Sequence, residues 1–152
     1  MADHQTVVTV TETGAGVYTQ EIKAGAHVSI ADEPEDVGGL DRGPAPYDLL
    51  LSSLGACTSM TVRMYANQKK WPLDKISVTL THHKEAGPDN TKVDVISRDI
   101  TLTGALDDTQ RARLLEIANK CPIHRTLENK PQITSRLVEP SAKTAAPKPP
   151  TP

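Results

Sequence analysis

Aromatic residues and thiols are scarce in this 152-residue chain, which contains no phenylalanine, one tryptophan, three tyrosines and two cysteines. The core must therefore be built from aliphatic side chains, and a chain of this kind gains from a partner that buries further surface. The length predicts a single domain. We expect the domain to span residues 1–139 and the proline-rich segment 140–152 to be a disordered tail.

Charge and hydropathy argue against two classes of protein. The net charge of −2 gives no basic surface of the kind that binds nucleic acid. The chain lacks a run of about 18 apolar residues, so we expect no membrane span, and its polar first residues do not form a signal segment. We therefore expect a cytoplasmic protein, in which cysteines are reduced by default and a disulfide would be transient.

The first third of the chain predicts three short strands. Apolar and polar residues alternate over residues 8–10, 17–21 and 27–30, and Gly14, Gly16 and Gly25 mark the turns. The acidic segment 31–41 is expected to be a solvent-exposed connection. Two prolines, at positions 44 and 46, then predict the start of a helix.

The central segment 46–70 predicts a long helix. Its first half is apolar nearly all round, which indicates burial on several sides. Its last residues are polar and cationic, as suits a helix C-terminus. Trp71 and Pro72 end it.

The second half of the chain predicts a hairpin followed by two helices and a strand. Residues 76–82 and 93–102 alternate as strands around a turn at 87–90. Asp107 and Gln110 have the spacing of a helix capping box. A short helix follows Pro122 to about residue 127, and 132–138 predicts a last strand. The order β-β-β-α-β-β-α-α-β indicates an α+β domain with a core helix laid on sheet.

Two motifs contain the two cysteines, which lie 64 residues apart. Residues 43–51 (GPAPYDLLL) lead to Gly55-Ala56-Cys57, and Cys121 lies in residues 118–124 (ANKCPIH). Together with the element order, over about residues 6–138, they resemble the OsmC/Ohr family, the osmotically inducible and organic hydroperoxide resistance proteins. The resemblance implies a two-layer α+β fold with a long buried central helix, and an intertwined homodimer with two active sites at its interface.

The resemblance also implies thiol-dependent reduction of organic hydroperoxides, in defence against oxidative stress. In such a cycle Cys57 is the peroxidatic thiol and becomes a sulfenic acid, and Cys121 is the resolving thiol that condenses with it to a disulfide. A dithiol reductant, such as a lipoylated protein, reopens the disulfide. No cofactor is implied.

The helix around Cys57 offers an apolar face. Leu50, Leu54, Met60 and Met64 all lie within about 60° of Cys57 on a helical wheel. Such a face suits an alkyl hydroperoxide as substrate. It is equally the face of any buried helix, in which cysteine serves as a small core residue.

Activation of Cys57 requires a cation, because this residue lies about three turns inside the helix, beyond the reach of the helix dipole. The family uses an arginine held by a glutamate. Here Tyr47 stands at the expected position of that glutamate, and Asp48 is the adjacent acid. Arg42, in the loop before the helix, is the candidate cation. Asp48 is the candidate orienting acid, although its place about 180° from Cys57 equally suits a first-turn acid.

Cys121 has a different route to reactivity. If Pro122 is the first residue of the short helix, Cys121 is its cap and lies close to free backbone N–H groups, which favour a thiolate. The order of attack is therefore open, and Cys121 could react first with Cys57 resolving. His124 could assist, or lie at the surface.

Two other classes of protein stay open at this point. Cys121 and His124, with Cys57 or the His82-His83 pair, could form a zinc site, but their spacing is not that of a zinc motif, and adjacent strand residues point to opposite faces. We therefore expect no metal. Alternatively, the chain is an OsmC-like protein that holds a small ligand in an apolar pocket and has little or no peroxidase activity.

Overall fold

The computed structural model describes residues 5–140. Within them the helices and strands follow in the order β1 (Val8–Glu12), β2 (Gln20–Ala24), β3 (His27–Ala31), η1 (Glu35–Val37), α1 (Pro46–Lys69), β4 (Lys75–Ala86), η2 (Pro88–Asn90), β5 (Lys92–Thr103), α2 (Asp108–Ala118) and α3 (Pro122–Glu128). This mixed α+β arrangement confirms the predicted class and its long central helix.

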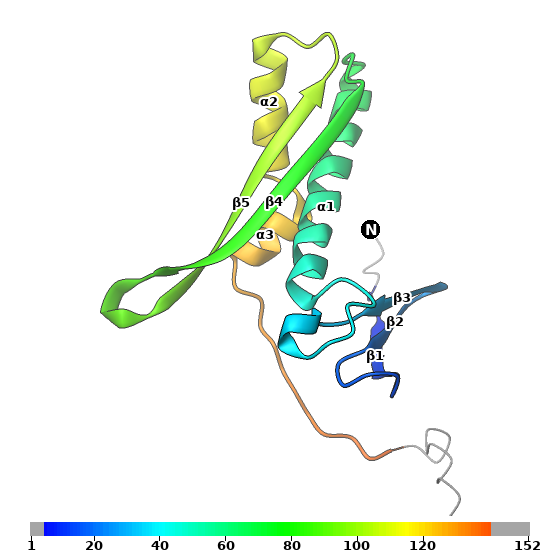
Figure 1. Cartoon of the computed structure of the whole chain (residues 1–152). Helices are drawn as coiled ribbons and strands as arrows, with labels where there is room; N and C mark the ends of the chain where they lie inside the picture. Colours follow the sequence, from blue (N-terminus) through cyan, green and yellow to red (C-terminus); the bar gives the residue numbers. More distant parts are fainter. Residues whose placement is uncertain (1–4, 141–152) are drawn as a thin grey trace, which may run out of the picture.

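The strands form two separate antiparallel sheets. β1, β2 and β3 form a meander near the N-terminal end of α1, and β4 pairs with β5 in a long hairpin, from Lys75 opposite Thr103 to Ala86 opposite Lys92. Figure 1 shows α1 running alongside the hairpin, whose tip projects beyond the helices. Along β5, Ile96, Ile100 and Leu102 are half-buried, and the residues at positions 97, 99 and 101 between them are exposed. One face of the hairpin is therefore covered.

The central helix α1 packs against β4, α2 and α3 and has five buried residues, more than any other element in residues 5–140. The expected burial of its first half on several sides is not found, since only Leu54 and Gly55 are buried there. Its buried side chains recur at every fourth residue, at Leu54, Thr58, Val62 and Ala66. This spacing places them in a single stripe along one side of the helix. The helix ends where Lys70 takes a left-handed conformation with φ of 56°.

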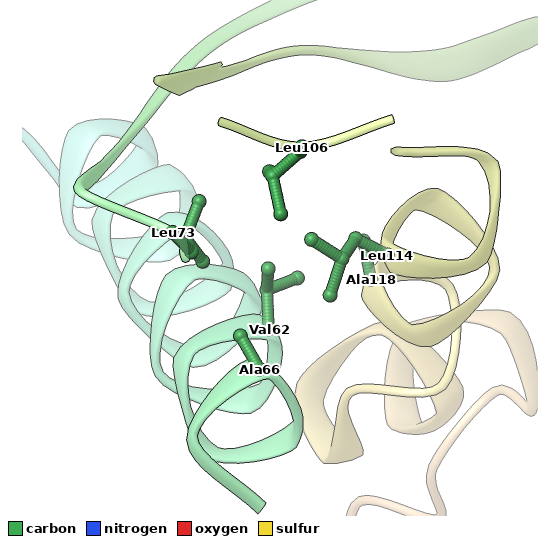
Figure 2. Close-up of a cluster of buried hydrophobic side chains, with 6 residues drawn as sticks. All are labelled: Val62, Ala66, Leu73, Leu106, Leu114 and Ala118. Carbon is green, nitrogen blue, oxygen red and sulfur yellow. The ribbon is translucent and has the colours of Figure 1, made fainter. Parts of the chain in front are cut away.

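The core lies between α1 and α2 and is aliphatic, as the composition predicts. Figure 2 shows Val62 and Ala66 of α1 facing Leu114 and Ala118 of α2. Leu73 and Leu106, from the segments that lead to and from the hairpin, close the cluster. The few aromatic side chains contribute at the margin, where Tyr65 meets the edge of Trp71.

A buried aspartate ties the N-terminal sheet to the loop that precedes α1. The carboxylate of Asp32 accepts hydrogen bonds from the Thr19 hydroxyl at 3.0 Å, the Glu33 N–H at 2.9 Å and the Arg42 N–H at 3.4 Å. Burial raises the pKa of Asp32, but these hydrogen bonds outweigh it and hold the pKa below the ordinary value. The carboxylate therefore joins the residue before β2 to the loop that follows β3.

Both C-terminal helices begin as the sequence predicts. Asp107 caps α2 by accepting from the Gln110 N–H at 2.7 Å, and the Gln110 side chain accepts from the Asp107 N–H at 3.0 Å. Cys121 caps α3, with Pro122 as its first residue. These are local motifs, so their sequence spacing is sufficient to locate them.

Two predicted strands differ from the structure. β2 begins at Gln20 rather than near residue 17. The strand predicted over 132–138 is absent, since residues 129–140 have no regular structure, and Ile133, Leu137 and Val138 are 86%, 103% and 72% exposed. A strand requires a neighbouring edge to pair with, which an alternating pattern alone cannot supply. The tail predicted from residue 140 lies beyond the described residues, except for Pro140 itself.

Within residues 5–140, no helix is both long enough and apolar enough to cross a membrane.

Candidate functional site

The fold brings the two cysteine-containing segments together. Cys57 is half-buried on α1, whereas Cys121 is fully buried, and both are free thiols. Thr58, the residue after Cys57, is also fully buried, and its Oγ1 lies 3.7 Å from the Sγ of Cys121. α1 therefore passes directly beside Cys121 at the turn that contains Cys57.

Arg98 of β5 reaches into this junction. Its Nη1 donates to Thr58 Oγ1 at 2.7 Å and to the Ala118 carbonyl at 3.3 Å. Its Nη2 lies 2.9 Å from Asn119 Oδ1 and 3.0 Å from His124 Nδ1. These four contacts match the four N–H groups of the two terminal nitrogens, so the guanidinium is fixed in place.

His124 connects Arg98 to α3. Since Arg98 donates to Nδ1, the proton of a neutral imidazole lies on Nε2, which is 3.1 Å from Glu128 Oε1. The backbone N–H of His124 donates to Cys121 Sγ at 3.4 Å. Cys121 thus receives one hydrogen bond from α3 and faces one hydroxyl from α1.

Sequence reasoning missed Arg98, although the sequence contains a signal that could have found it. From Ile96 onward, the half-buried positions of β5 are Ile96, Arg98, Ile100 and Leu102, so an arginine occupies the apolar side of an alternating strand. A charge on the covered face of a sheet needs partners. Here the partners come from α1, α2 and α3.

A cavity of about 620 Å³ opens beside this network. Its volume is within the range of about 300–1,000 Å³ that is usual for small-molecule sites. Apolar and polar side chains share its wall, namely Tyr47, Leu50, Leu54, His82, Asp94, Ile96, Arg98, His124, Leu127 and Glu128. The cavity therefore offers apolar surface next to a fixed guanidinium.

A second polar group lies in the wall of the cavity. His82 Nε2 lies 2.8 Å from Asp94 Oδ1, and Lys84 Nζ lies 2.7 Å from the same oxygen. A hydrogen bond from Lys84, and to a smaller extent one from His82, holds the pKa of Asp94 below its ordinary value. The Tyr47 ring stacks on His82 with a centroid separation of 4.1 Å. Tyr47, which stands at the expected position of the family's glutamate, thus packs against a histidine instead of holding an arginine.

The other residues singled out from the sequence are distributed more widely. Leu50 and Leu54 line the cavity, whereas Met60 and Met64 are 65% and 72% exposed and lie outside its lining. Arg42 is exposed and lines a different hollow, with Thr13, Ala15, Thr19 and Ile30.

Asp48 serves as a first-turn acid in α1. Its Oδ2 accepts a hydrogen bond from the Ala45 N–H at 3.0 Å. Among the hydrogen bonds and ion pairs of residues 5–140, none joins Arg42 or Asp48 to Cys57, the thiol that they were expected to activate. Arg63, on the same helix, donates to the carbonyls of Leu73 and Asp74.

The residues weighed for zinc have other partners. Both ring nitrogens of His124 are engaged, by Arg98 and Glu128, and His82 is paired with Asp94. Across residues 5–140, no group of three or more histidine, cysteine, aspartate or glutamate side chains is arranged to hold a metal ion.

Comparison with known proteins places the chain among relatives of one fold. The structure is similar to that of the organic hydroperoxide resistance protein OsmC of Legionella pneumophila, with 21% identity, a TM-score of 0.64, and coverage of 84% of this chain and 91% of that one. The OsmC-like protein of Mycoplasma pneumoniae gives 20% identity, a TM-score of 0.70, and coverage of 84% and 90%.

A third similar structure is an organic hydroperoxide resistance protein of Vibrio cholerae with captopril in one active site, at 22% identity, a TM-score of 0.62, and coverage of 86% and 88%. A search among curated proteins gives no match. The family model described as OsmC-like protein matches residues 38–136, which include both cysteines and Arg98. The chain is therefore a member of the OsmC-like protein family.

Proposed function

We propose that the protein is a thiol-dependent peroxidase that reduces organic hydroperoxides through Cys57 and Cys121. Membership of the OsmC-like family supports a redox or peroxide-resistance role. The observation that carries the proposal is the meeting of the two cysteine segments, where Thr58 and Cys121 are in contact beside the cavity. Cys57 is half-buried and Cys121 fully buried, and their segments meet at Thr58, although neither thiol is among the residues that line the cavity. This difference in burial suits a pair in which Cys57 meets the substrate and Cys121 resolves it.

The cycle has three steps. The Cys57 thiolate attacks the terminal oxygen of the hydroperoxide, so an S–O bond forms, the O–O bond breaks and the alkoxide takes up a proton to leave as alcohol. The Cys121 thiolate then attacks the sulfenic sulfur, forming the disulfide and releasing hydroxide, which becomes water. A dithiol reductant exchanges with this disulfide and is itself oxidised to a disulfide.

The cavity supports an organic rather than an inorganic peroxide. Leu50 and Leu54 from α1, with Ile96 from β5 and Leu127 from α3, provide apolar lining for an alkyl chain. Arg98 and His124 provide polar groups in the lining of the same cavity. We therefore expect alkyl hydroperoxides to be preferred to hydrogen peroxide.

The proposal includes a homodimer, a cytoplasmic location and a dithiol reductant such as a lipoylated protein. In a dimer, Arg42 of a second copy remains a candidate cation for Cys57, with Asp48 as its orienting acid. Arg98 supplies a cation within the same chain, close to Cys121.

Consumption of cumene hydroperoxide with dihydrolipoamide as donor tests the function. The wild type should turn over, Cys57→Ser should fall to the uncatalysed rate, and Cys121→Ser should lose sustained turnover because its sulfenic acid is not resolved. One equivalent of peroxide should lower the intact mass by about two hydrogens in the wild type alone. Turnover by Cys57→Ser at the wild-type rate would contradict the assignment.

The volume and apolar lining of the cavity also fit a second candidate function, a small-ligand-binding protein with little or no peroxidase activity. The same assay separates the two. A wild type that shows no turnover and forms no disulfide with peroxide supports the binding protein. In that case Leu54→Trp should block ligand binding, and Cys57→Ser should leave ligand binding unchanged.

A further inference from the structure

We infer that Thr58 is a positioning residue through which Arg98 stabilises the thiolate of Cys121. The inference rests on the proposed function. It gives the Thr58 hydroxyl a role in the steps in which Cys121 reacts as a thiolate or leaves as one. Thr58 and Cys121 are both fully buried, so water does not take the place of this contact.

The hydrogen bonds of Thr58 define the state with a neutral thiol. Its hydroxyl carries one proton, which it donates to the Leu54 carbonyl at 2.7 Å. Its oxygen accepts from Arg98 at 2.7 Å and faces Cys121 Sγ at 3.7 Å, where an S–H group can donate to it. All of these contacts are satisfied while Cys121 is protonated.

Loss of the thiol proton changes what the sulfur requires. A thiolate has no donor, and it accepts from the His124 N–H at 3.4 Å. Rotation of the Thr58 hydroxyl turns its proton from the Leu54 carbonyl toward Sγ, while Arg98 continues to donate to the same oxygen. Because the guanidinium polarises that hydroxyl, its donated bond is stronger than that of an ordinary threonine. Back-bonding to the residue four positions earlier is common in helices, so the bond to Leu54 alone would be unremarkable; the bonds to Arg98 and Cys121 distinguish Thr58.

The charges around Cys121 agree with this role. Arg98 comes from β5, and His124 and its partner Glu128 come from α3. The helix α1 contributes Thr58, which is uncharged, and Lys120 at the end of α2 is exposed. Arg98 is therefore the charged side chain that bonds directly to a group in contact with the sulfur.

The role acts in two steps of the cycle. When Cys121 attacks the sulfenic acid of Cys57, the S–S bond forms, the S–O bond breaks and hydroxide leaves to become water. When a dithiol reductant attacks Cys57, the S–S bond breaks and Cys121 leaves with the electron pair as a thiolate. A stabilised thiolate is available for the first step and leaves more readily in the second.

The thiolate absorbance near 240 nm provides the test, in a Cys57→Ser background where Cys121 is the remaining thiol. The difference spectrum against Cys57→Ser/Cys121→Ser isolates its signal. Adding Thr58→Val removes the hydroxyl at nearly constant shape, and the ratio of thiolate to thiol at pH 7 should fall by about tenfold, as expected for one hydrogen bond to a charged group. Adding Arg98→Gln should have a similar effect.

Matched variants separate positioning from folding. Thr58→Ser keeps the hydroxyl and should restore the absorbance. Arg113→Gln removes an α2 arginine that contacts Tyr65 of α1, away from Cys121, and should leave the absorbance unchanged. Circular dichroism shows whether each variant is folded. An absorbance that stays the same in folded Thr58→Val overturns the inference, whether or not the wild type reduces hydroperoxides. Failure of the wild type to consume peroxide instead overturns the proposed function, while the absorbance still decides the role of Thr58.

Discussion

Two charged residues in this protein each hold several segments together, because each of them bonds to several partners at once. Arg98 places four donor groups on four partners that come from three helices, and a lysine, with three donors at one point, could not reproduce that geometry. Asp32 is an anionic counterpart, since its carboxylate accepts from Thr19 just before β2 and from Glu33 and Arg42 in the loop after β3.

Asp32→Asn should loosen the N-terminal sheet in a pH-dependent way. Because the pKa of Asp32 is lowered in the folded state, its contribution to stability is present above the unfolded value of about 4 and is lost as the pH falls through the folded value. Amide exchange in β1–β3 should therefore be faster in the variant than in the wild type at pH 6, and the two should converge in acid. Exchange in β4–β5 is the internal control. Equal exchange of the sheet in both proteins at pH 6 would remove Asp32 as its anchor.

The residues near Cys121 show what sequence can locate. Cys121 as a helix cap followed from the proline after it, which is a local feature. The role of Arg98 could not be predicted in this way, because its partners lie from 20 to 40 positions away along the chain. Long-range packing decides which buried arginine meets which helix end, and the one sequence clue was its place on the apolar side of a strand.

Secondary-structure elements followed the sequence wherever their signals were local. The capping box of α2, the hairpin turn and the end of the central helix all lie near their predicted positions. The strand expected over 132–138 failed because pairing depends on a partner edge that the segment itself does not contain. Packing of α1 on α2 then decides which apolar residues of each helix are buried.

Two neighbouring leucines of α2 test this packing. Leu114 is completely buried in the cluster with Val62 and Ala66, whereas Leu115 is 55% exposed. Leu114→Ala should lower the free energy of unfolding by about 2–5 kcal/mol, because it leaves a cavity in the core. Leu115→Ala should change it by less than about 0.5 kcal/mol. Urea unfolding of both variants measures the difference, and equal losses would contradict the assigned orientation of α2.

At the scale of the whole molecule, much apolar surface is exposed in a single chain. Met60 and Met64 lie on the Cys57 side of α1 and are largely exposed, and Val8, Val10 and Val28 are exposed in the N-terminal sheet. Side chains of this kind are buried when a second copy covers them. They are the structural basis for the homodimer that we propose.

Light scattering at micromolar concentration should give the mass of a dimer. Met60→Glu/Met64→Glu should shift it toward the monomer while circular dichroism stays unchanged, because both side chains are exposed in the isolated chain. Leu115→Glu, an exposed apolar position on α2, is the matched control and should remain dimeric. A wild type that is monomeric under these conditions would contradict the dimer.

The depth of Cys121 also makes its sulfur a probe of cooperative opening. Thr58 faces this thiol from a position 63 residues away in sequence, and Arg98, which bonds to Thr58, lies 40 residues from Thr58. The enclosure therefore exists only when α1, β5 and α3 are docked at the same time, and fraying of one of them at its end does not dismantle it. Slow labelling of Cys121 in the native protein would then measure the free energy of a large-scale opening rather than local mobility.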